Sequence, residues 1–245
     1  MFDRRSLLRT AAFAAPALSL TTGTAAASVR PRTLAAAGGP LVYGVLGDSI
    51  TGRGSFASRN DTAWTALLQA RLAKDWQVTR VDGSTSRDAA NLTCLATVNT
   101  IPFGCDLVVV GLGTNDCHEQ RNGRYVYTPH DTRIAARGLF RAVAAANPCA
   151  VIVSLGVWGD RSVRWSVDDW TPPVSRVAYW DAIIAECCLE SGGIPLSCAD
   201  LYDTSAYRLP AGRQAFGGNV TDGFHPNDAG HGALYQRVAN QLGLA

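Results

Sequence analysis

Residues 106–112, DLVVVGL, form the clearest strand pattern in the sequence, because they are apolar on both faces of an extended chain. Runs of this kind are typical of parallel sheets that are covered by helices on both sides. Four further short segments, at 41–47, 77–81, 150–155 and 194–198, are also predicted to be strands. The sequence therefore predicts an α/β protein with five parallel strands.

Helical patterns alternate with these strands. Apolar residues recur at helical spacing in 63–74, 88–98, 134–146, 177–190 and 228–242. No internal repeat or linker interrupts the alternation. We therefore expect a single three-layer domain from residue 41 to residue 245.

The charge of the chain is concentrated at its beginning. The chain has 245 residues, of which 47% are hydrophobic, and a formal net charge of +2. Residues 1–27 contain three arginines and one aspartate, so the remainder is neutral. A neutral body argues against a protein that binds nucleic acid or an anionic membrane.

Residues 1–27 have the features of a secretory signal. An arginine pair, Arg4-Arg5, precedes a short apolar stretch, and small residues end the segment. The pair is similar to the twin-arginine class of signals. A membrane anchor is the alternative, but Pro16 breaks the stretch, which is shorter than the roughly 20 residues of a span. We expect residues 28–40 to be a flexible lead-in, and the mature protein to be secreted or periplasmic without stable membrane insertion.

Polar residues follow the predicted strands. The block Gly47-Asp48-Ser49 follows the first strand, and Asn115 lies in the block that follows the third. Asp222 and His225 come just before the last predicted helix. Because ligands bind at the carboxyl ends of parallel strands, we expect these side chains to meet in one site.

These residue types are the components of nucleophilic acyl transfer. A serine hydroxyl becomes a good nucleophile when an imidazole accepts its proton and a carboxylate orients that imidazole. Ser49, His225 and Asp222 fit these three roles. The oxyanion of the intermediate needs fixed donors, and the candidates are the backbone N–H groups of Ser49 and of a residue near Ser86, with the Asn115 amide.

The blocks resemble those of the SGNH hydrolases, also called GDSL esterases and lipases. The resemblance extends from residue 41 to residue 242, and it implies a flavodoxin-like sheet of order 2-1-3-4-5 and ester hydrolysis without a metal. By matching position it implies that Ser49 is the nucleophile, Asn115 an oxyanion donor, His225 the general base and Asp222 its orienting carboxylate. In this order the first and third strands are neighbours, which brings Ser49 beside Asn115.

The second block departs from the family pattern. The family usually has a glycine there that donates its backbone N–H. The position in best register here is Ser86, with Gly83 three residues earlier. A serine can also donate its N–H, so the second backbone donor is either Ser86 or Gly83.

The remaining polar residues are expected to be structural. We expect Asp48 and Asp116 to brace their turns, and His118, His130 and His231 to make surface or loop contacts. The sequence contains no HExxH metal motif, no GxGxxG dinucleotide fingerprint and no GxSxG nucleophile elbow. No cofactor is therefore expected.

Seven cysteines occur without a CxxC pair, and an oxidising compartment would allow disulfides among them. The sharpest prediction is Cys105–Cys149, because each residue precedes one of two strands that are neighbours in the order implied by the resemblance. The odd number leaves at least one thiol free or bonded to another chain. The alternatives are Cys187 or Cys188 with Cys198, Cys94 with Cys105, or seven buried thiols.

Three of the six tryptophans lie in the long segment that follows the fourth strand. Long loops at this edge of a sheet are often functional, and aromatic faces suit a sugar ring. We expect Trp158 to border the pocket, with Trp165 and Trp170 further out. In the alternative, these rings only attach the loop to the body.

The sequence thus predicts a secreted, monomeric serine esterase that hydrolyses small, acetyl-like esters of small molecules or carbohydrates through an acyl-Ser49 intermediate. One alternative is a lipase, lysophospholipase or thioesterase that accepts longer acyl chains. Another is an acyltransferase. A binding module on an inactive fold is disfavoured by the complete set of serine, asparagine, aspartate and histidine.

Overall fold

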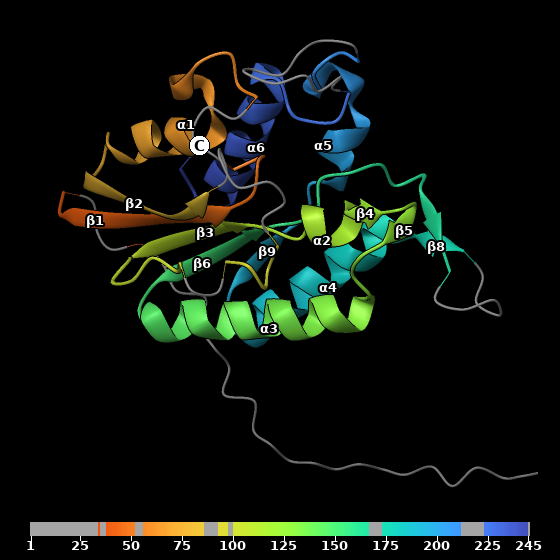
Figure 1. The fold of residues 1–245 in the computed structure, drawn as a ribbon. Helices are drawn as coiled ribbons and strands as arrows, with labels where there is room; N and C mark the ends of the chain where they lie inside the picture. The colour runs from red at the N-terminus through yellow and green to blue at the C-terminus, as the bar shows by residue number, and fades with distance from the viewer. Residues whose placement is uncertain are drawn as a thin grey trace, which may run out of the picture. The chain divides into compact units, whose positions relative to one another are not determined.

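Five parallel strands form the central sheet, in the order β2-β1-β3-β6-β9 (Figure 1). They are β1 (Pro40–Gly47), β2 (Gln77–Thr85), β3 (Leu107–Gly111), β6 (Val151–Leu155) and β9 (Ile194–Leu196). Numbered among themselves along the chain, these strands have the order 2-1-3-4-5. The predicted three-layer, flavodoxin-like α/β fold is therefore confirmed.

This structure is a computed structural model, and it describes residues 34, 38–51, 56–85, 93–97, 100–166, 173–211 and 223–244. All of these residues belong to one unit of the chain, Pro31–Ala245. The predicted signal at 1–27 and most of the lead-in at 28–40 lie outside the described residues, so both stay predictions. None of the helices described has both the length and the hydropathy needed to cross a membrane.

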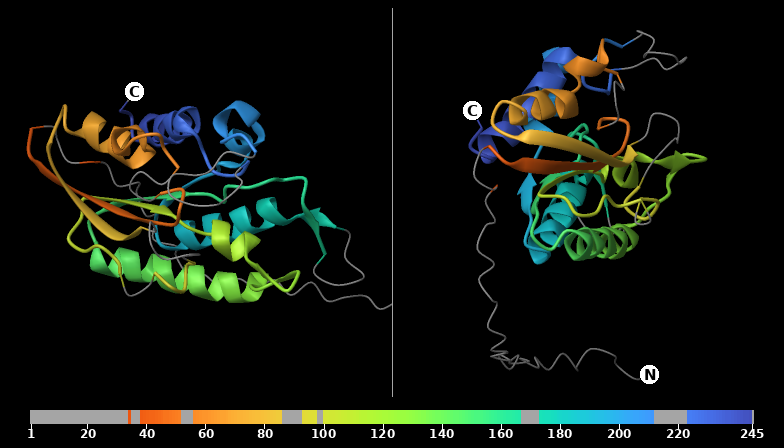
Figure 2. Two further views of the ribbon diagram at one scale, coloured as in Figure 1. Left: turned by 45° about the horizontal axis from the view of Figure 1, so that its top comes forward. Right: turned by 90° about the vertical axis from the view of Figure 1, so that its left-hand side faces the viewer.

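Helices cover both faces of the sheet (Figures 1 and 2). On one face α1 (Trp64–Leu72) packs with α6 (Asp228–Gln241), and on the other α3 (Pro129–Ala146) packs with α4 (Arg176–Glu190). Successive strand residues enter opposite cores: Val45 and Val109 pack with α1 and α6, whereas Leu46 and Val110 pack with α3 and α4. Burial of both faces explains why the sequences of β1, β3 and β6 are almost continuously apolar.

Most predicted helix and strand boundaries agree with the structure within a few residues. The largest difference is at the start of one helix, and local hydrogen bonding explains it. Helix α3 begins at Pro129 rather than at residue 134. The Thr128 hydroxyl accepts the Asp131 N–H at 3.2 Å, and Pro129 occupies the first helical position, where its missing N–H costs nothing. The helix predicted at 88–98 falls largely outside the described residues, and its described part, 93–97, is a turn.

Several short elements that the sequence analysis did not predict follow the strands at the carboxyl edge of the sheet (Figure 1). They are α2 (Thr114–His118), α5 (Ala199–Asp203), the hairpins β4–β5 (Gln120–Arg121 and Arg124–Tyr125) and β7–β8 (Arg164–Trp165 and Val174–Ser175), and the 3-10 turns η1 (Asn60–Thr62) and η2 (Ser205–Tyr207). They shape the edge at which the candidate site lies, and α5 and α2 also add buried residues such as Leu201 and Cys117 to the two cores.

The predicted disulfides are not formed, because all seven cysteines are free thiols. Cys105 is buried, whereas its predicted partner Cys149 is exposed. A Cβ atom on Gly44 of β1 would lie 2.8 Å from the Cys105 Sγ, so the thiol packs against β1 and not toward β6. The alternatives that paired Cys94, Cys187, Cys188 or Cys198 are also not found, and these side chains pack in the cores as small apolar groups.

Candidate active site

Ser49 lies in a tight turn at the carboxyl end of β1. The Asp48 N–H donates to the Gly111 carbonyl of β3 at 3.1 Å, and the Thr51 N–H donates to the Asp48 carbonyl at 3.0 Å. The Ile50 N–H donates to Asp48 Oδ1 at 3.0 Å. Hydrogen bonds therefore fix the backbone on both sides of Ser49, and they hold its side chain at the end of the strand.

His225 meets Ser49 from a segment 176 residues away in the chain, with 3.0 Å between His225 Nε2 and Ser49 Oγ. This histidine lies three residues before α6, whose N-cap residue Asn227 accepts the Gly230 N–H at 2.9 Å. The His225 carbonyl accepts the Leu209 N–H at 2.9 Å, which ties the segment to the preceding chain. The predicted pairing of serine and imidazole is thus present, with Nε2 facing the hydroxyl.

Asn115 lies in α2, which begins just after β3. Gly113 caps this helix with a φ of 109°, and a Cβ atom there would lie 2.8 Å from the Ile184 side chain, so the turn requires glycine. The register of β1 and β3 pairs Gly47 with Gly111, so Ser49 and Asn115 follow adjacent strand ends. The role of Asn115 as an oxyanion donor stays a prediction.

Of the residues predicted for the catalytic and oxyanion roles, Asp222 and Ser86 lie outside the described residues. Gly83, the alternative to Ser86, lies within β2. A Cβ atom on Gly83 would lie 2.4 Å from the Thr100 carbonyl oxygen. Close packing is therefore enough to explain why this position is a glycine, whether or not its N–H is an oxyanion donor. The choice between Ser86 and Gly83 as a donor therefore stays open.

Asp48 and Asp116 are buried carboxyl groups, each 1% exposed. Asp48 braces its own turn, as predicted, whereas Asp116 accepts the Cys94 N–H at 3.1 Å and braces the turn at 93–97. Burial raises the pKa of Asp48 to about 7, and the nearby Asp116 adds to this shift. Burial likewise raises the pKa of Asp116 to about 6.

Asp48→Asn is expected to change how stability depends on pH. The folded protein holds the Asp48 proton more tightly than the unfolded chain does. This carboxyl group therefore stabilises the fold fully below about pH 4 and loses that contribution as the pH rises through about 7. Asparagine does not ionise, so the melting temperature of the variant should rise relative to wild type between about pH 4 and pH 7 and stay level above that, with a slope of at most about 1.4 kcal/mol per pH unit in unfolding free energy.

Thermal unfolding followed by circular dichroism at several pH values measures this difference. The matched control is Asp61→Asn, because the Asp61 side chain is 70% exposed. A difference between Asp48→Asn and wild type that stays constant with pH would contradict the assignment of a proton to Asp48.

Two phenylalanines that the sequence analysis missed contact the His225 ring. Phe56 stacks on it, with ring centroids 3.4 Å apart and planes inclined by 10°. Phe224 meets it edge-on, with centroids 5.3 Å apart and planes inclined by 83°. Phe224 neighbours the histidine in sequence and could have been considered, but no sequence pattern marks Phe56.

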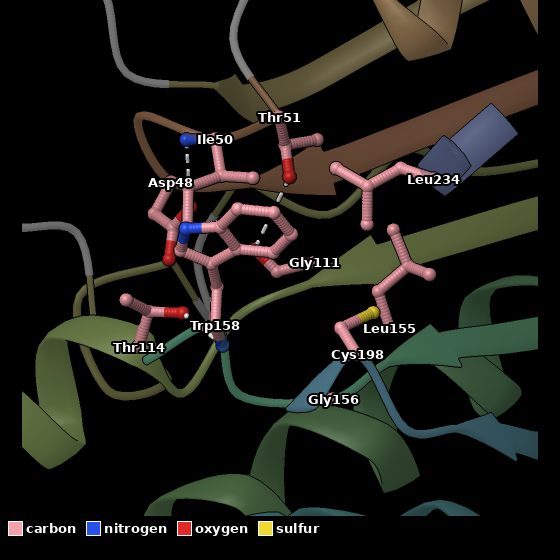
Figure 3. A pocket seen from close by; sticks show the side chains of 10 residues that line it. All are labelled: Asp48, Ile50, Thr51, Gly111, Thr114, Leu155, Gly156, Trp158, Cys198 and Leu234. Atoms are coloured by element: carbon pink, nitrogen blue, oxygen red, sulfur yellow. Dashed lines mark hydrogen bonds between the residues drawn. The ribbon is translucent and has the colours of Figure 1, made fainter. Parts of the chain in front are cut away.

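Trp158 supports the histidine segment from inside the protein. It is 1% exposed, and its indole N–H donates to the Phe224 carbonyl at 2.6 Å. Its ring is therefore enclosed by the protein, and a contact between Trp158 and substrate stays a prediction. With Asp48 and Thr114 it lines a cavity of about 10 Å³ next to the Ser49 turn (Figure 3), which has room for about one water molecule and none for an acyl chain.

Trp165 lies beside helix α4 and the start of α3, and not in the cavity that Trp158 lines. Its ring packs edge-on against Trp180 of α4, with centroids 5.2 Å apart. With Arg133 and Tyr179 it lines a pocket of about 390 Å³ near the start of α3. Trp170 is outside the described residues, so its predicted contact with substrate stays a prediction.

His231 is buried, contrary to the prediction of a surface or loop contact, whereas His118 is half-buried. His118 lies in α2 and meets Phe224 edge-on, with centroids 5.3 Å apart. Burial, together with the nearby Arg176 charge, lowers the pKa of His118 to about 4, so it is neutral near pH 7. His231 lies in α6, and its Nδ1 accepts the Trp64 N–H at 3.4 Å. Only His130, at the start of α3, is exposed.

The arrangement can support proton transfer from a serine to an imidazole. Among the residues that the structure describes, no three His, Cys, Asp or Glu side chains come together as metal ligands would. The serine and the imidazole lie at the edge of the sheet where ligands bind in folds of this type.

Comparisons with known proteins identify the family. The sequence model of the GDSL-like Lipase/Acylhydrolase family matches residues 45–233. The chain belongs to this family, whose members are ester-hydrolysing enzymes. A search of curated proteins found no match.

Solved structures share the fold at low sequence identity. One is LAE5, an alpha/beta hydrolase enzyme from the metagenome of Lake Arreo, at 20% identity and a TM-score of 0.59, covering 86% of this chain and 97% of that one. Another is a two-domain esterase active on acetylated mannans, at 16% identity and a TM-score of 0.55, covering 84% and 50%. A third is an extracellular lipase from Streptomyces rimosus, at 19% identity and a TM-score of 0.51, covering 82% and 99%.

Proposed function

We propose that this protein is a secreted serine esterase that removes small, acetyl-like acyl groups from a carbohydrate through an acyl-Ser49 intermediate. The observation that carries this proposal is the hydrogen bond of 3.0 Å between Ser49 Oγ and His225 Nε2. A serine bonded to an imidazole at the end of a parallel strand is the arrangement that nucleophilic acyl transfer needs. Membership of the GDSL-like family supports ester hydrolysis as the reaction.

In the acylation step, Ser49 Oγ attacks the ester carbonyl carbon while His225 Nε2 accepts the hydroxyl proton. The carbon–oxygen bond to the alcohol then breaks, and the alcohol leaves with that proton. The negative oxygen of the intermediate would be held by the Ser49 N–H, the Asn115 amide and the N–H of Ser86 or Gly83. Asp222 would accept a hydrogen bond from the Nδ1–H of His225, which keeps that proton and holds Nε2 toward the serine.

In the deacylation step, water takes the place of the alcohol. His225 accepts a proton from the water, whose oxygen attacks the acyl carbon, and the bond to Ser49 Oγ breaks. Ser49 then recovers its proton from His225, so the enzyme returns to its first state. The products are a free acid and an alcohol, and the cycle needs no cofactor.

The choice of a small acyl group and a sugar alcohol has its own support. The pocket at Trp165 combines two aromatic rings with the Arg133 side chain, a combination that suits a sugar ring with its hydroxyl groups. One esterase of the same fold is active on acetylated mannans.

Export completes the proposal. Residues 1–27 carry an arginine pair, an apolar stretch and a small-residue end, which together are typical of a twin-arginine-like signal. The Streptomyces rimosus lipase that shares this fold is extracellular. An exported enzyme would meet acylated polysaccharides outside the cell.

Trp165→Ala is expected to lower kcat/KM on an acetylated oligosaccharide by about 3- to 10-fold, because a stacking face is lost. Hydrolysis of p-nitrophenyl acetate, which has no sugar ring, should change little. Trp165→Phe keeps a stacking face and should retain most of the activity on the sugar ester. Steady-state kinetics on both esters measure the difference.

The same assay decides between the proposed substrate and its main alternative. Equal losses on both esters in Trp165→Ala would contradict a sugar-binding role for this ring. A wild-type preference for long-chain esters over acetates would overturn the small-acyl proposal and favour a lipase.

A further inference from the structure

The Phe56 side chain lies flat on the histidine proposed above as the general base. The 3.4 Å separation of the ring centroids and the 10° between the planes describe a face-to-face stack. Phe224 contacts the same ring edge-on, and its backbone is held by the Trp158 indole. The two phenylalanines therefore contact the imidazole in a stacked and an edge-on geometry, while Nε2 lies 3.0 Å from Ser49 Oγ.

The backbone of Phe56 has a conformation that phenylalanine rarely adopts. Its φ is 64°, in the left-handed region that favours glycine. Among the described residues, the other non-glycine residue with positive φ is Asn122, which lies in the β4–β5 turn, where asparagine is well tolerated. Strain of this kind persists only where surrounding contacts hold it, and it concentrates at functional sites.

Hydrogen bonds tie the segment after Phe56 to the helix that follows His225. Asp228 Oδ1 accepts the Ser58 N–H at 2.7 Å and the Thr62 hydroxyl at 3.0 Å, and Oδ2 accepts the Ser58 hydroxyl. Partial burial works against ionisation of Asp228, but the bonds from Ser58 and Thr62 outweigh it and keep its pKa below the usual value. Asp228 is the first residue of α6, and His225 lies three residues before it. The segments that carry Phe56 and His225 are therefore both held at the N-terminus of α6.

We propose that Phe56 is a positioning residue for the esterase reaction, held against His225 by the Asp228 anchor. Its ring keeps the imidazole in the plane in which Nε2 faces Ser49, and its π face stabilises the imidazolium that forms during acylation. This inference rests on the proposed function. It adds to that function a residue outside the serine, asparagine, aspartate and histidine set.

The chemistry of the step explains why such a ring would raise the rate. When Ser49 attacks the ester, its proton moves to Nε2 and positive charge develops on the imidazole. The face of a phenyl ring carries negative partial charge, so it attracts the charged imidazole more strongly than the neutral one. A contact that strengthens in the transition state raises kcat and leaves substrate binding unchanged.

Phe56→Leu removes the π face and keeps an apolar side chain. We expect kcat on p-nitrophenyl acetate to fall about 3- to 30-fold with KM unchanged, as loss of a desolvated cation–π contact would produce. Phe56→Tyr restores the ring and should return kcat to within about 2-fold of wild type. The matched control is Phe103→Leu, because Phe103 is 80% exposed.

A second measurement reports on Ser49 without turnover. The rate at which a p-nitrophenyl alkylphosphonate inactivates the enzyme depends on the attack by Ser49 and its proton transfer to His225. Phe56→Leu should slow this inactivation by the same factor as it lowers kcat. Melting temperatures of all variants identify any that have merely unfolded.

A double-mutant cycle tests the anchor. Asp228→Asn weakens the bonds to Ser58 and Thr62, and we expect it to lower kcat by about 2- to 5-fold in the wild-type background. If Asp228 acts through Phe56, the same change in Phe56→Leu should cost almost nothing. Fully additive losses would overturn the anchoring part of the proposal.

Other outcomes overturn the role of Phe56 itself. A wild-type kcat in Phe56→Leu would do so. A higher KM at unchanged kcat, or a gain on bulkier esters, would also do so, because Phe56 would then be a wall of the substrate site. Failure of the proposed function is distinguishable, since in that case Ser49→Ala would retain activity whatever residue occupies position 56.

Discussion

Ser49→Ala is expected to lower kcat on p-nitrophenyl acetate by about 10⁴- to 10⁶-fold while the protein stays folded. Ser49 Oγ is the atom that His225 Nε2 faces at 3.0 Å, so without it no acyl-enzyme can form. The turn should survive the change, because its hydrogen bonds come from the backbone and from the Asp48 carboxyl group. Steady-state kinetics with a matched melting temperature measure both effects.

The control for this variant is Ser162→Ala, which removes the hydroxyl of an exposed serine in the turn at 160–163. It should have wild-type kinetics. Turnover by a clean preparation of Ser49→Ala at the wild-type rate would exclude Ser49 as the nucleophile, and with it the proposed mechanism.

Asn115→Ala is expected to lower kcat by about 100- to 1,000-fold with little change in KM. The amide would donate to an oxygen that becomes negative only in the intermediate, so its loss should raise the barrier without weakening the binding of the neutral ester. The same ester and assay measure the split between kcat and KM.

The matched control for Asn115 is Asn240→Ala, because Asn240 is an exposed residue of α6 that pairs with Gln236. A higher KM at unchanged kcat in Asn115→Ala would place this side chain in substrate binding. Unchanged kinetics would remove it from the site altogether.

The middle of the sheet could be predicted because β1, β3 and β6 have two buried faces. Val108 and Val109 of β3 enter opposite cores, so both must be apolar, and a continuous apolar run results. Helix α2 could not be predicted in this way, because five residues are too few to show a period. A distant residue supports it: Arg176 Nε donates to the Cys117 carbonyl at 2.6 Å, and its guanidinium lies 3.7 Å from the Trp180 ring centroid.

The pairing of Ser49 with His225 could be predicted because each residue lies beside the end of a regular element. Contacts that depend on the direction of a side chain could not. Trp158 follows β6 closely, and the chain continues inward there, with Val157 fully buried and Trp158 nearly so. The prediction of Cys105–Cys149 assumed that adjacent strand ends bring the thiols together, but the Cys105 side chain packs against Gly44 on the other neighbouring strand.

Phe56 illustrates a further limit. It belongs to no periodic pattern, and its place on His225 depends on a positive φ and on hydrogen bonds to a residue far along the chain. Such contacts are set by tertiary structure, which local propensity does not contain.

The most direct test of Ser49 as the nucleophile is labelling of the purified mature protein with a p-nitrophenyl alkylphosphonate, followed by intact mass spectrometry and peptide mapping. We predict one adduct per chain, located on Ser49, that forms in proportion to the loss of esterase activity and is absent from Ser49→Ala. A fully inactivated protein whose Ser49 is unmodified, or a fully labelled Ser49 in a protein that keeps its activity, would contradict the assignment.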